Sequence, residues 1–243
     1  ALLMRSVEPG RGTVRDLKVQ DDARIIEWYS RIVRLHERDL EEDEARKLSG
    51  QAPRRGNRPP PRQGENPPTI ESRTLSLLAR EPSARPLKLP EPAAPGDWPF
   101  EVVGVPLPEP GFHVLEVESR RLGRALLERN ASMYVRTAAL VTNLAVHYKR
   151  SPENALVWVT SLDRALPVAG ANVTVHDCTG KPVWRGTTDA QGRALISQPL
   201  EAGYQGCVHE HGLFITASKA DAAGSAAKGT APATDLAFVF STW

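Results

Sequence analysis

The sequence predicts a mainly β protein made of two consecutive antiparallel β-sandwiches. From Tyr134 onward, about seven short strand patterns are separated by turns at intervals of roughly 8–12 residues, as in a two-sheet sandwich. Between residues 82 and 119, further short apolar patterns have prolines at their ends, where edge strands tolerate them. We place the two sandwiches at residues 1–130 and 131–243.

The first sandwich is expected to carry two additions, a helical insertion at about residues 21–49 and a flexible, Pro/Arg-rich loop at about residues 50–70. A chain of 243 residues is long enough for two such domains. No apolar run is long enough to span a bilayer. The sequence starts without Met and shows no signal peptide, so we expect a piece of a longer protein whose targeting signal or anchor lies outside it.

The helical signal lies in "DDARIIEWYSRIVRLHERDLEEDEARKLSG". Its apolar residues recur at three- and four-residue intervals, and they are Ile25, Ile26, Tyr29, Ile32, Val33 and Leu40. Asp21 or Asp22 can cap the start, and Gly50 can end the segment. The acidic residues 41–44 would fall where the dipole of one long helix disfavours negative charge. We therefore expect a break or a second short helix near Asp39.

The proline-rich loop is the most basic part of a chain whose net charge is only +2. That small net charge argues against general electrostatic binding to nucleic acid. A solvated loop is the interpretation we favour for this stretch, and an RNA- or membrane-binding tail is the alternative. Arginines in such loops are cut by trypsin-like proteases, so we predict a protease-sensitive loop at Arg54, Arg55, Arg58 and Arg62. That a cut there triggers a global change is a further hypothesis.

Alternation in the second half indicates which strand residues share a face. Val141, Leu144 and Val146 are candidates for burial. In "NALVWVTSLD", one face carries Leu156, Trp158 and Thr160. Exposed aromatic residues on a sheet face would indicate a binding module, and Trp158 and Trp184 are the candidates for it. Their place in the alternation predicts that both belong to the core instead.

The stretch "WRGTTDAQGRALI", residues 184–196, allows a metal-binding loop or the tip of a β-hairpin. A calcium loop needs oxygen ligands at alternate positions and a closing Glu. No second carboxylate follows Asp189, whereas Asp189 and Gly192 suit a tight turn. We therefore predict a hairpin.

Cys178 and Cys207 form neither a CxxC pair nor a zinc spacing. In an oxidising compartment they can form a disulfide that stabilises by about 3–4 kcal/mol. In the cytosol they would be two buried thiols. We favour the disulfide.

The pair His209 and His211 is the remaining candidate for metal chemistry, with Cys207 or Asp177 as a third ligand if the chain folds back. A histidine pair beside a glycine is more often exposed, so we predict no metal site and no cofactor. The chain shows no nucleophile elbow, HExxH helix, phosphate loop or dinucleotide-binding glycine pattern. From the residues alone, we predict that the chain is not an enzyme.

Three stretches occur together in the second half, "LVTNLAVHYK", "LVWVTSLD" and "TTDAQG". This combination resembles the N-terminal part of bacterial alpha-2-macroglobulins, and the resemblance extends over roughly residues 97–243. It implies macroglobulin-type, fibronectin-III-like sandwiches within a periplasmic protease trap anchored to the inner membrane. The trap's thioester motif, CxEQ, is absent, because Cys178 precedes "TGK" and Cys207 precedes "VHE". No catalytic residue is therefore carried over from the family.

The resemblance implies a non-catalytic scaffold role in envelope defence. The implied partners are other domains of the same chain, target proteases met through the full-length protein, and peptidoglycan synthases or other envelope proteins. Membrane contact is implied only through an anchor outside this sequence. The alternative from another functional class is an extracytoplasmic adhesion module or a glycan- or protein-binding module, because β-sandwiches host many functions.

Overall fold

The computed structural model describes residues 2–4, 13–36, 38–50, 68–88, 101–127, 130–201, 212–220 and 234–242. The chain divides into two units that interleave along the sequence. Unit 1 comprises residues 1–18, 31–106 and 113–139, and unit 2 comprises residues 19–30, 107–112 and 140–243. The predicted mainly β class with antiparallel sheets is confirmed. The predicted division was a single boundary after residue 130. The observed division differs from it, because residues 19–30 and 107–112 also belong to unit 2.

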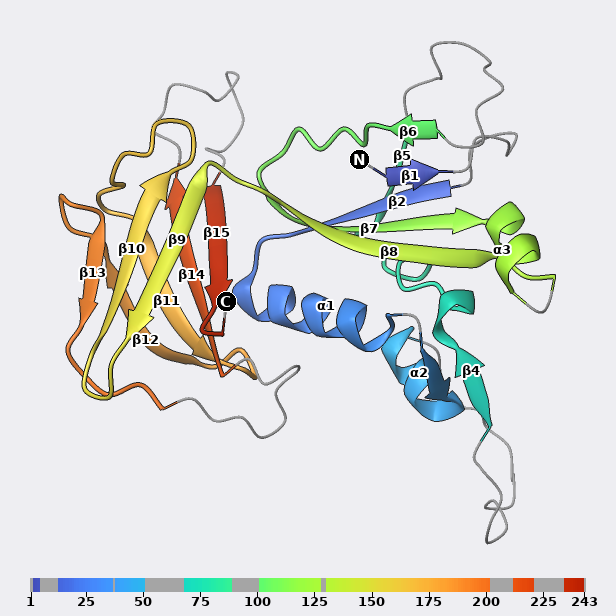
Figure 1. Ribbon diagram of the computed structural model, residues 1–243, viewed down its shortest axis with the longest axis horizontal. Coiled ribbons are helices and arrows are strands. Elements are labelled where there is room, and N and C mark those ends of the chain that lie inside the picture. The colour runs from blue at the N-terminus through green and yellow to red at the C-terminus, as the bar shows by residue number, and fades with distance from the viewer. Residues whose placement is uncertain are drawn as a thin grey trace, which may run out of the picture. The chain divides into compact units, whose positions relative to one another are not determined.

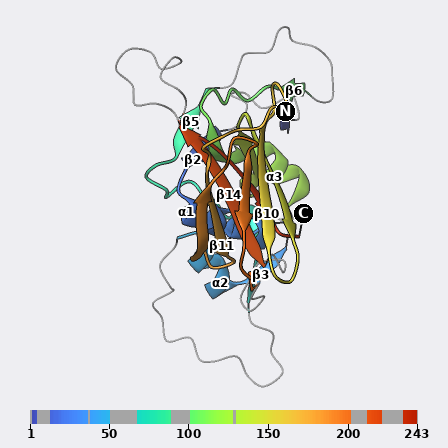
Figure 2. The ribbon, with the colours of Figure 1, turned by 90° about the vertical axis from the view of Figure 1, so that its left-hand side faces the viewer.

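Unit 2 is a two-sheet sandwich (Figure 1). Its strands are β9 (Leu144–Arg150), β10 (Ala155–Ser161), β11 (Asn172–Asp177), β12 (Pro182–Thr187), β13 (Arg193–Ile196), β14 (Leu213–Ala220) and β15 (Thr234–Phe240). One sheet has the order β13-β10-β9 and the other β12-β11-β14-β15, and the neighbouring strands are antiparallel. Figure 2 shows β10 of one sheet beside β11 and β14 of the other.

The core of this sandwich lies between the two sheets. Ala155, Val157 and Val159 of β10 are buried against Val173 and Val175 of β11. The prediction that Trp158 belongs to the core is therefore wrong, because successive residues of a strand point to opposite faces. The Trp158 side chain lies on the outer face and is 40% exposed. Trp184 is half-buried and packs against the core, as predicted.

The outer face of the four-stranded sheet carries a cluster of aromatic rings. The Phe214 ring lies 5.0 Å from that of Phe238 and 5.1 Å from that of Phe240, measured between centroids. Residues 19–30 and 107–112 add two more rings from elsewhere in the sequence. Tyr29 lies 4.8 Å from Phe240, and Phe112 lies 5.7 Å from Phe238. Unit 2 thus uses distant segments to cover one of its outer faces.

Unit 1 contains a four-stranded sheet and two small two-stranded sheets. The large sheet has the order β5 (Arg85–Leu87), β2 (Thr13–Val19), β7 (Gly111–Ser119) and β8 (Met133–Val141). The small sheets pair β1 (Leu2–Met4) with β6 (Glu101–Val103) and β3 (Asp39–Glu41) with β4 (Thr69–Glu71). Strand β7 is almost entirely buried along both faces, so its polar side chains need partners inside the protein.

The predicted helical segment divides as the charge pattern suggested. Helix α1 spans Asp22–Arg34, and α2 spans Glu42–Leu48 after the short strand β3. The acidic residues 42–44 thereby occupy the first turn of α2, where the helix dipole favours negative charge. Asp21 caps α1 by accepting a hydrogen bond of 2.9 Å from the Arg24 N–H. Gly50, with φ of 66°, follows the end of α2.

Two elements complete unit 1, the 3-10 turn η1 (Ser72–Thr74) and helix α3 (Arg120–Leu126). Ser119 caps α3, because its Oγ accepts a hydrogen bond of 3.0 Å from the Leu122 N–H. Among the described residues, no helix combines the length and apolarity needed to cross a membrane.

Candidate functional site

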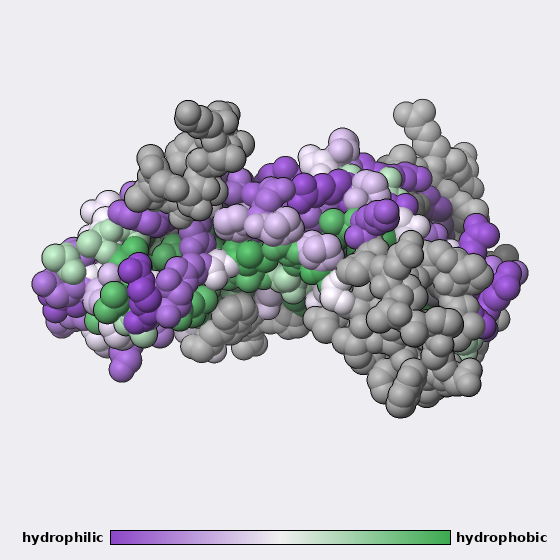
Figure 3. Space-filling view, turned by 90° about the horizontal axis from the view of Figure 1, so that it is seen from above, coloured by the Kyte–Doolittle hydropathy of each residue, from purple (hydrophilic) through white to green (hydrophobic). Residues whose placement is uncertain are grey.

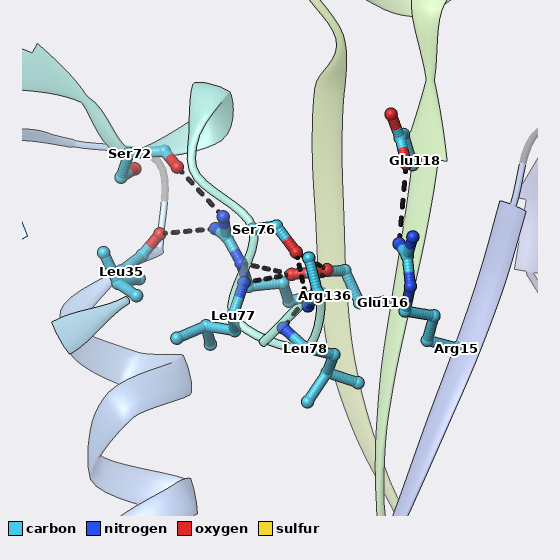
Figure 4. Close-up of polar contacts among 10 residues, drawn as sticks. Arg15, Leu35, Ser72, Ser76, Leu77, Leu78, Glu116, Glu118 and Arg136 are labelled. Atoms are coloured by element: carbon cyan, nitrogen blue, oxygen red, sulfur yellow. Dashed lines mark hydrogen bonds and ion pairs between the residues drawn. The ribbon is translucent and has the colours of Figure 1, made fainter. Parts of the chain in front are cut away.

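The most extensive buried polar cluster of the described residues surrounds Glu116 of β7 (Figure 4). Its carboxylate accepts hydrogen bonds from the Ser76 hydroxyl, from the Leu77 N–H at 2.6 Å and from the Leu78 N–H at 3.3 Å. Arg136 Nε of β8 lies 3.4 Å from the same carboxylate. Consecutive backbone N–H groups of this kind form a nest for an anion. The carboxylate of Glu116 fills that nest, so it is not open to an external ligand.

Arg136 joins this cluster to two backbone carbonyls. One terminal nitrogen donates to the Leu35 carbonyl at 3.3 Å, and the other donates to the Ser72 carbonyl at 3.0 Å. Burial lowers the pKa of Arg136 below its usual value, and the nearby Glu116 carboxylate offsets only part of this shift. An arginine nevertheless stays protonated in proteins. The guanidinium therefore serves as a fixed fork between β8, the residue after α1 and η1.

A second buried pair in unit 1 joins β2 to β7. His113 Nδ1 lies 2.8 Å from Asp16 Oδ1, and both side chains are fully buried. Arg85 Nε of β5 lies 3.3 Å from Asp16 Oδ2. A histidine beside a carboxylate is half of a catalytic triad, but this pair has no exposure through which a substrate could reach it. It acts as a link across three neighbouring strands.

The third cluster lies in unit 2, at the first turn of α1. Thr216 Oγ1 of β14 donates a hydrogen bond of 2.9 Å to Asp22 Oδ2, and His176 Nε2 of β11 lies 3.4 Å from that oxygen. Burial raises the pKa of Asp22 and lowers the pKa of His176. The three residue types match a nucleophilic triad, but the hydroxyl donates to the carboxylate and not to the imidazole. Because the Thr216 and His176 side chains are buried, the cluster is not arranged for acyl transfer.

One small cavity of unit 1 borders Arg136. The cavity lined by Leu35, Arg73, Met133 and Arg136, among others, has a volume of about 40 Å³. It has room for a few water molecules, whereas pockets for organic ligands are several times larger. Within the part of the chain that the structure describes, no three His, Cys, Asp or Glu side chains gather as metal ligands would.

The predicted site residues fall partly outside the described residues. Arg54, Arg55, Arg58 and Arg62 of the protease-sensitive loop lie outside them, and so do His209, His211 and Cys207. Cys178 follows β11 and takes part in a disulfide bond. Its pairing with Cys207 stays a prediction, as does cleavage at the four arginines.

The turn at Asp189 is confirmed, but the predicted hairpin is wrong. Asp189 Oδ1 accepts hydrogen bonds of 2.9 Å from the N–H groups of Gln191 and Arg193, and Gly192 has φ of 71°. These backbone donors, led by that of Arg193, lower the pKa of Asp189. However, β12 pairs with β11 and β13 pairs with β10. The turn therefore connects the two sheets of the sandwich rather than two paired strands.

The buried clusters were missed by reasoning from the sequence, although a signal for one of them exists. In "GFHVLEVES", His113 and Glu116 interrupt a strand that is otherwise mostly apolar. Such an interruption predicts a partnered polar group inside the protein. The sequence does not identify the partners, because they are distant along the chain. Asp16 lies 97 positions from His113, and Ser76 lies 40 positions from Glu116.

Comparison with known families finds a match in the second unit. Residues 141–243 match the model of the bacterial alpha-2-macroglobulin MG3 domain. This range, less than half of the chain, is similar to that domain. The matched range contains every strand of the sandwich from β9 to β15. The predicted alpha-2-macroglobulin resemblance is thus confirmed on the part of the chain where its motifs were found.

Two solved structures of native alpha-2-macroglobulin from Escherichia coli are similar to the chain. The one spanning domains NIE-MG1 is 12% identical with a TM-score of 0.49, covering 96% of this chain and 84% of that chain. The one spanning domains MG0-NIE-MG1 is 13% identical with a TM-score of 0.44, covering 93% and 54%. The chain therefore spans about half of the second structure. No curated protein matches the sequence.

Proposed function

We propose that this chain is a non-catalytic scaffold segment of a periplasmic protease inhibitor of the bacterial alpha-2-macroglobulin type. The observation that carries the proposal is the match of residues 141–243 to the MG3 domain, which coincides with the complete sandwich of unit 2. The contacts of three acidic groups support it. Glu116 and Asp16 are buried and Asp22 is partly buried, and each carboxylate contacts neighbouring elements of the fold.

A scaffold role suits these contacts for a physical reason. An inhibitor that changes shape when a protease cuts it must hold two arrangements of its domains, and rigid domains make such states discrete. Buried, hydrogen-bonded ion pairs position neighbouring elements with defined geometry. The partners of the chain are then other domains of the same polypeptide, and proteases are met through the whole protein. Envelope proteins such as peptidoglycan synthases are further candidate partners, and membrane attachment lies outside this sequence.

The test uses the protein as its host cell makes it. Its intact mass is measured before and after methylamine, which opens a thioester. Its hydrodynamic radius is measured before and after limited proteolysis, with the same protease blocked at its active site as the control. Compaction with only the active protease supports a trap, and a one-to-one methylamine adduct adds a thioester. An unchanged radius after cleavage overturns the inhibitor proposal.

The absence of catalysis has its own test. The enzyme alternative needs a metal ion held through His209 and His211. Elemental analysis of the purified chain, after dialysis against a trace of zinc, is expected to find well under one metal ion per chain. Stoichiometric zinc that is lost in a His209→Ala and His211→Ala variant would contradict the non-catalytic assignment.

A further inference from the structure

Residues 19–30 cover part of the outer face of the four-stranded sheet in unit 2, and we call them the strap. They include the first turns of α1, and the chain before and after them belongs to unit 1. On the outside of unit 2, hydrophobic residues lie scattered among hydrophilic ones (Figure 3). Beneath the strap, by contrast, Phe214 is 0% exposed and Phe240 is 4% exposed. The strap therefore shields aromatic rings of the sheet from water.

Apolar contacts hold the strap at two places. The Tyr29 ring lies 4.8 Å from the Phe240 ring, centroid to centroid. The turn after β11 approaches the helix at Gly180, where a Cβ atom would lie 3.4 Å from Ala23 and 3.6 Å from Ile26 Cδ1. These contacts do not change with pH, because none of their members titrates in the neutral to mildly acidic range.

A polar contact also holds the strap, and this one contains a histidine. Asp22 Oδ2 accepts a hydrogen bond of 2.9 Å from the Thr216 hydroxyl and lies 3.4 Å from His176 Nε2. The other ring nitrogen, His176 Nδ1, is buried and forms no hydrogen bond within the described part of the chain. A neutral imidazole can occupy this site with its proton on Nε2, because Nδ1 then has no proton to donate.

A proton taken up by His176 makes the closed strap less favourable. The protonated imidazole has a donor on both nitrogens. Nδ1 then becomes a buried donor without an acceptor, and leaving such a group unsatisfied costs about 1–3 kcal/mol. When the strap is released, water can solvate both nitrogens. The released state therefore binds this proton more tightly than the closed state.

The charged groups around His176 act in both directions. Burial lowers the pKa of His176 below 6.5, Arg185 of β12 acts in the same sense, and Asp22 and Asp177 oppose the shift. Burial raises the pKa of Asp22 above 3.8, and Asp21 adds to this effect. The contribution of His176 to the closed strap is thus present above pH 6.5 and is lost as the pH falls toward its lowered pKa. Protonation of Asp22 has the opposite effect.

We propose that residues 19–30 form a pH-sensitive strap, in which proton uptake by His176 releases the first turns of α1 from β11 and β14 and exposes Phe214 and Phe240. This device goes beyond the scaffold function and does not depend on it, because it needs only contacts within unit 2. Release of the strap is distinct from unfolding of the sandwich. The cluster of buried residues between the two sheets is apolar and contains neither Asp22 nor His176, so a local opening leaves it closed.

Hydrogen exchange of the complete chain, followed by mass spectrometry, tests the proposal. The protection of the strap amides is measured between about pH 7.5 and 5.5 and corrected for the intrinsic pH dependence of exchange. Strand β10 is the internal control, because its alternate residues lie in the core. One proton can change an opening constant by at most about tenfold per pH unit. We expect the protection of the strap to fall at least about threefold over this range, with that of β10 unchanged.

Two variants separate proton uptake from packing. His176→Gln keeps an N–H donor but takes up no proton, so its strap protection is expected not to fall as the pH is lowered. Thr216→Val removes the hydrogen bond to Asp22 and keeps His176, so its protection is expected to be lower at every pH and still to fall on acidification. Strap protection that does not fall in the wild-type chain overturns the proposal. So does a fall that persists in His176→Gln, or one that β10 shares.

Discussion

Thr216 Oγ1 donates a hydrogen bond of 2.9 Å to Asp22 Oδ2 across 194 positions of sequence. His176 Nε2 lies 3.4 Å from the same oxygen. A partly buried contact with two titratable members, Asp22 and His176, therefore holds the first turn of α1 to β11 and β14. Because a buried charge is costly unless it is compensated, the strength of this contact depends on pH.

The free energy of unfolding is expected to fall as the pH is lowered below 6.5 because of His176. Burial lowers the pKa of His176 below 6.5, although Asp22 opposes the shift. The folded chain then binds this proton more weakly than the unfolded chain, so its stability contribution is present above pH 6.5 and is lost toward the folded pKa. The effect of Asp22 on the free energy of unfolding has the opposite sign, since burial raises its pKa above 3.8. The contribution of Asp22 to stability therefore grows only as the pH is lowered toward 3.8.

Urea unfolding of the wild-type chain and a His176→Gln variant, at several pH values between 7.5 and 5.5, measures this effect. Asp21, Asp177 and Arg185, the other charged groups that influence the pair, are present in both proteins. The wild-type free energy is expected to fall more steeply. Equal slopes would show that His176 is not the titrating group.

Replacing Arg136 by Met is expected to lower the free energy of unfolding by about 3–5 kcal/mol, because it leaves the buried Glu116 without its cation. The matched control is Arg38→Ala. Its ion pair with Glu44 spans 3.2 Å, but both side chains are largely exposed, so its loss is expected to cost about 0–1 kcal/mol. Adding Glu116→Gln to Arg136→Met is expected to recover part of the loss. A change of less than about 1 kcal/mol in the single variant would refute the structural role of the pair.

Gly123 of α3 is expected to tolerate no side chain. A Cβ atom there would lie 1.8 Å from the Ala131 carbonyl oxygen, a backbone atom that cannot rotate away. Gly123→Ala is therefore expected to cost about 1–3 kcal/mol. Gly104→Ala, where a Cβ atom would meet nothing within 4 Å, is expected to change stability by less than about 0.5 kcal/mol. The midpoints of thermal unfolding of the two variants are compared. Similar midpoints would contradict the prediction that only Gly123→Ala is destabilising.

The disulfide of Cys178 is expected to close on Cys207. Without reductant, iodoacetamide should leave the intact mass of the unfolded chain unchanged, and after reduction it should add two adducts. A Cys178→Ser and Cys207→Ser double variant is expected to lose about 3–4 kcal/mol of stability on the chain-entropy model. Alkylation of the unreduced chain would contradict the pairing.

Trypsin is expected to cut first at Arg54, Arg55, Arg58 or Arg62. Changing all four to Gln should move the first cut elsewhere, as N-terminal sequencing of the fragments would show. The hydrodynamic radius of the singly cut protein then tests whether the loop is a trigger. A radius equal to that of the uncut protein would end the trigger hypothesis while leaving the cleavage prediction intact.

Local patterns predicted most strands of unit 2 and the break between α1 and α2. Strands such as "GLFITAS" and "DLAFVFSTW" carry β-branched and aromatic residues between turn residues, and this preference acts within a few positions. The acidic residues 42–44 likewise reveal the start of α2, because the helix dipole acts over a single turn.

Local patterns could not predict which side of its sheet Trp158 points to, or which strands the turn at Asp189 connects. Alternation shows that Val157 and Trp158 point to opposite sides, but which side is the core depends on where the second sheet packs. The turn at Asp189 has the same local geometry whether it joins paired strands or crosses between sheets. Only the partners, β11 for β12 and β10 for β13, distinguish the two.

The sequence by itself determined that this chain is mainly β, where most of its strands lie and which family its second half resembles. The tertiary structure alone decided that residues 19–30 join unit 2, that Glu116 meets Arg136 and that Trp158 faces outward. The physical reason is the range of the interactions. Backbone preference and capping are local in sequence, whereas burial and ion pairing are set by residues that come close only when the whole chain folds.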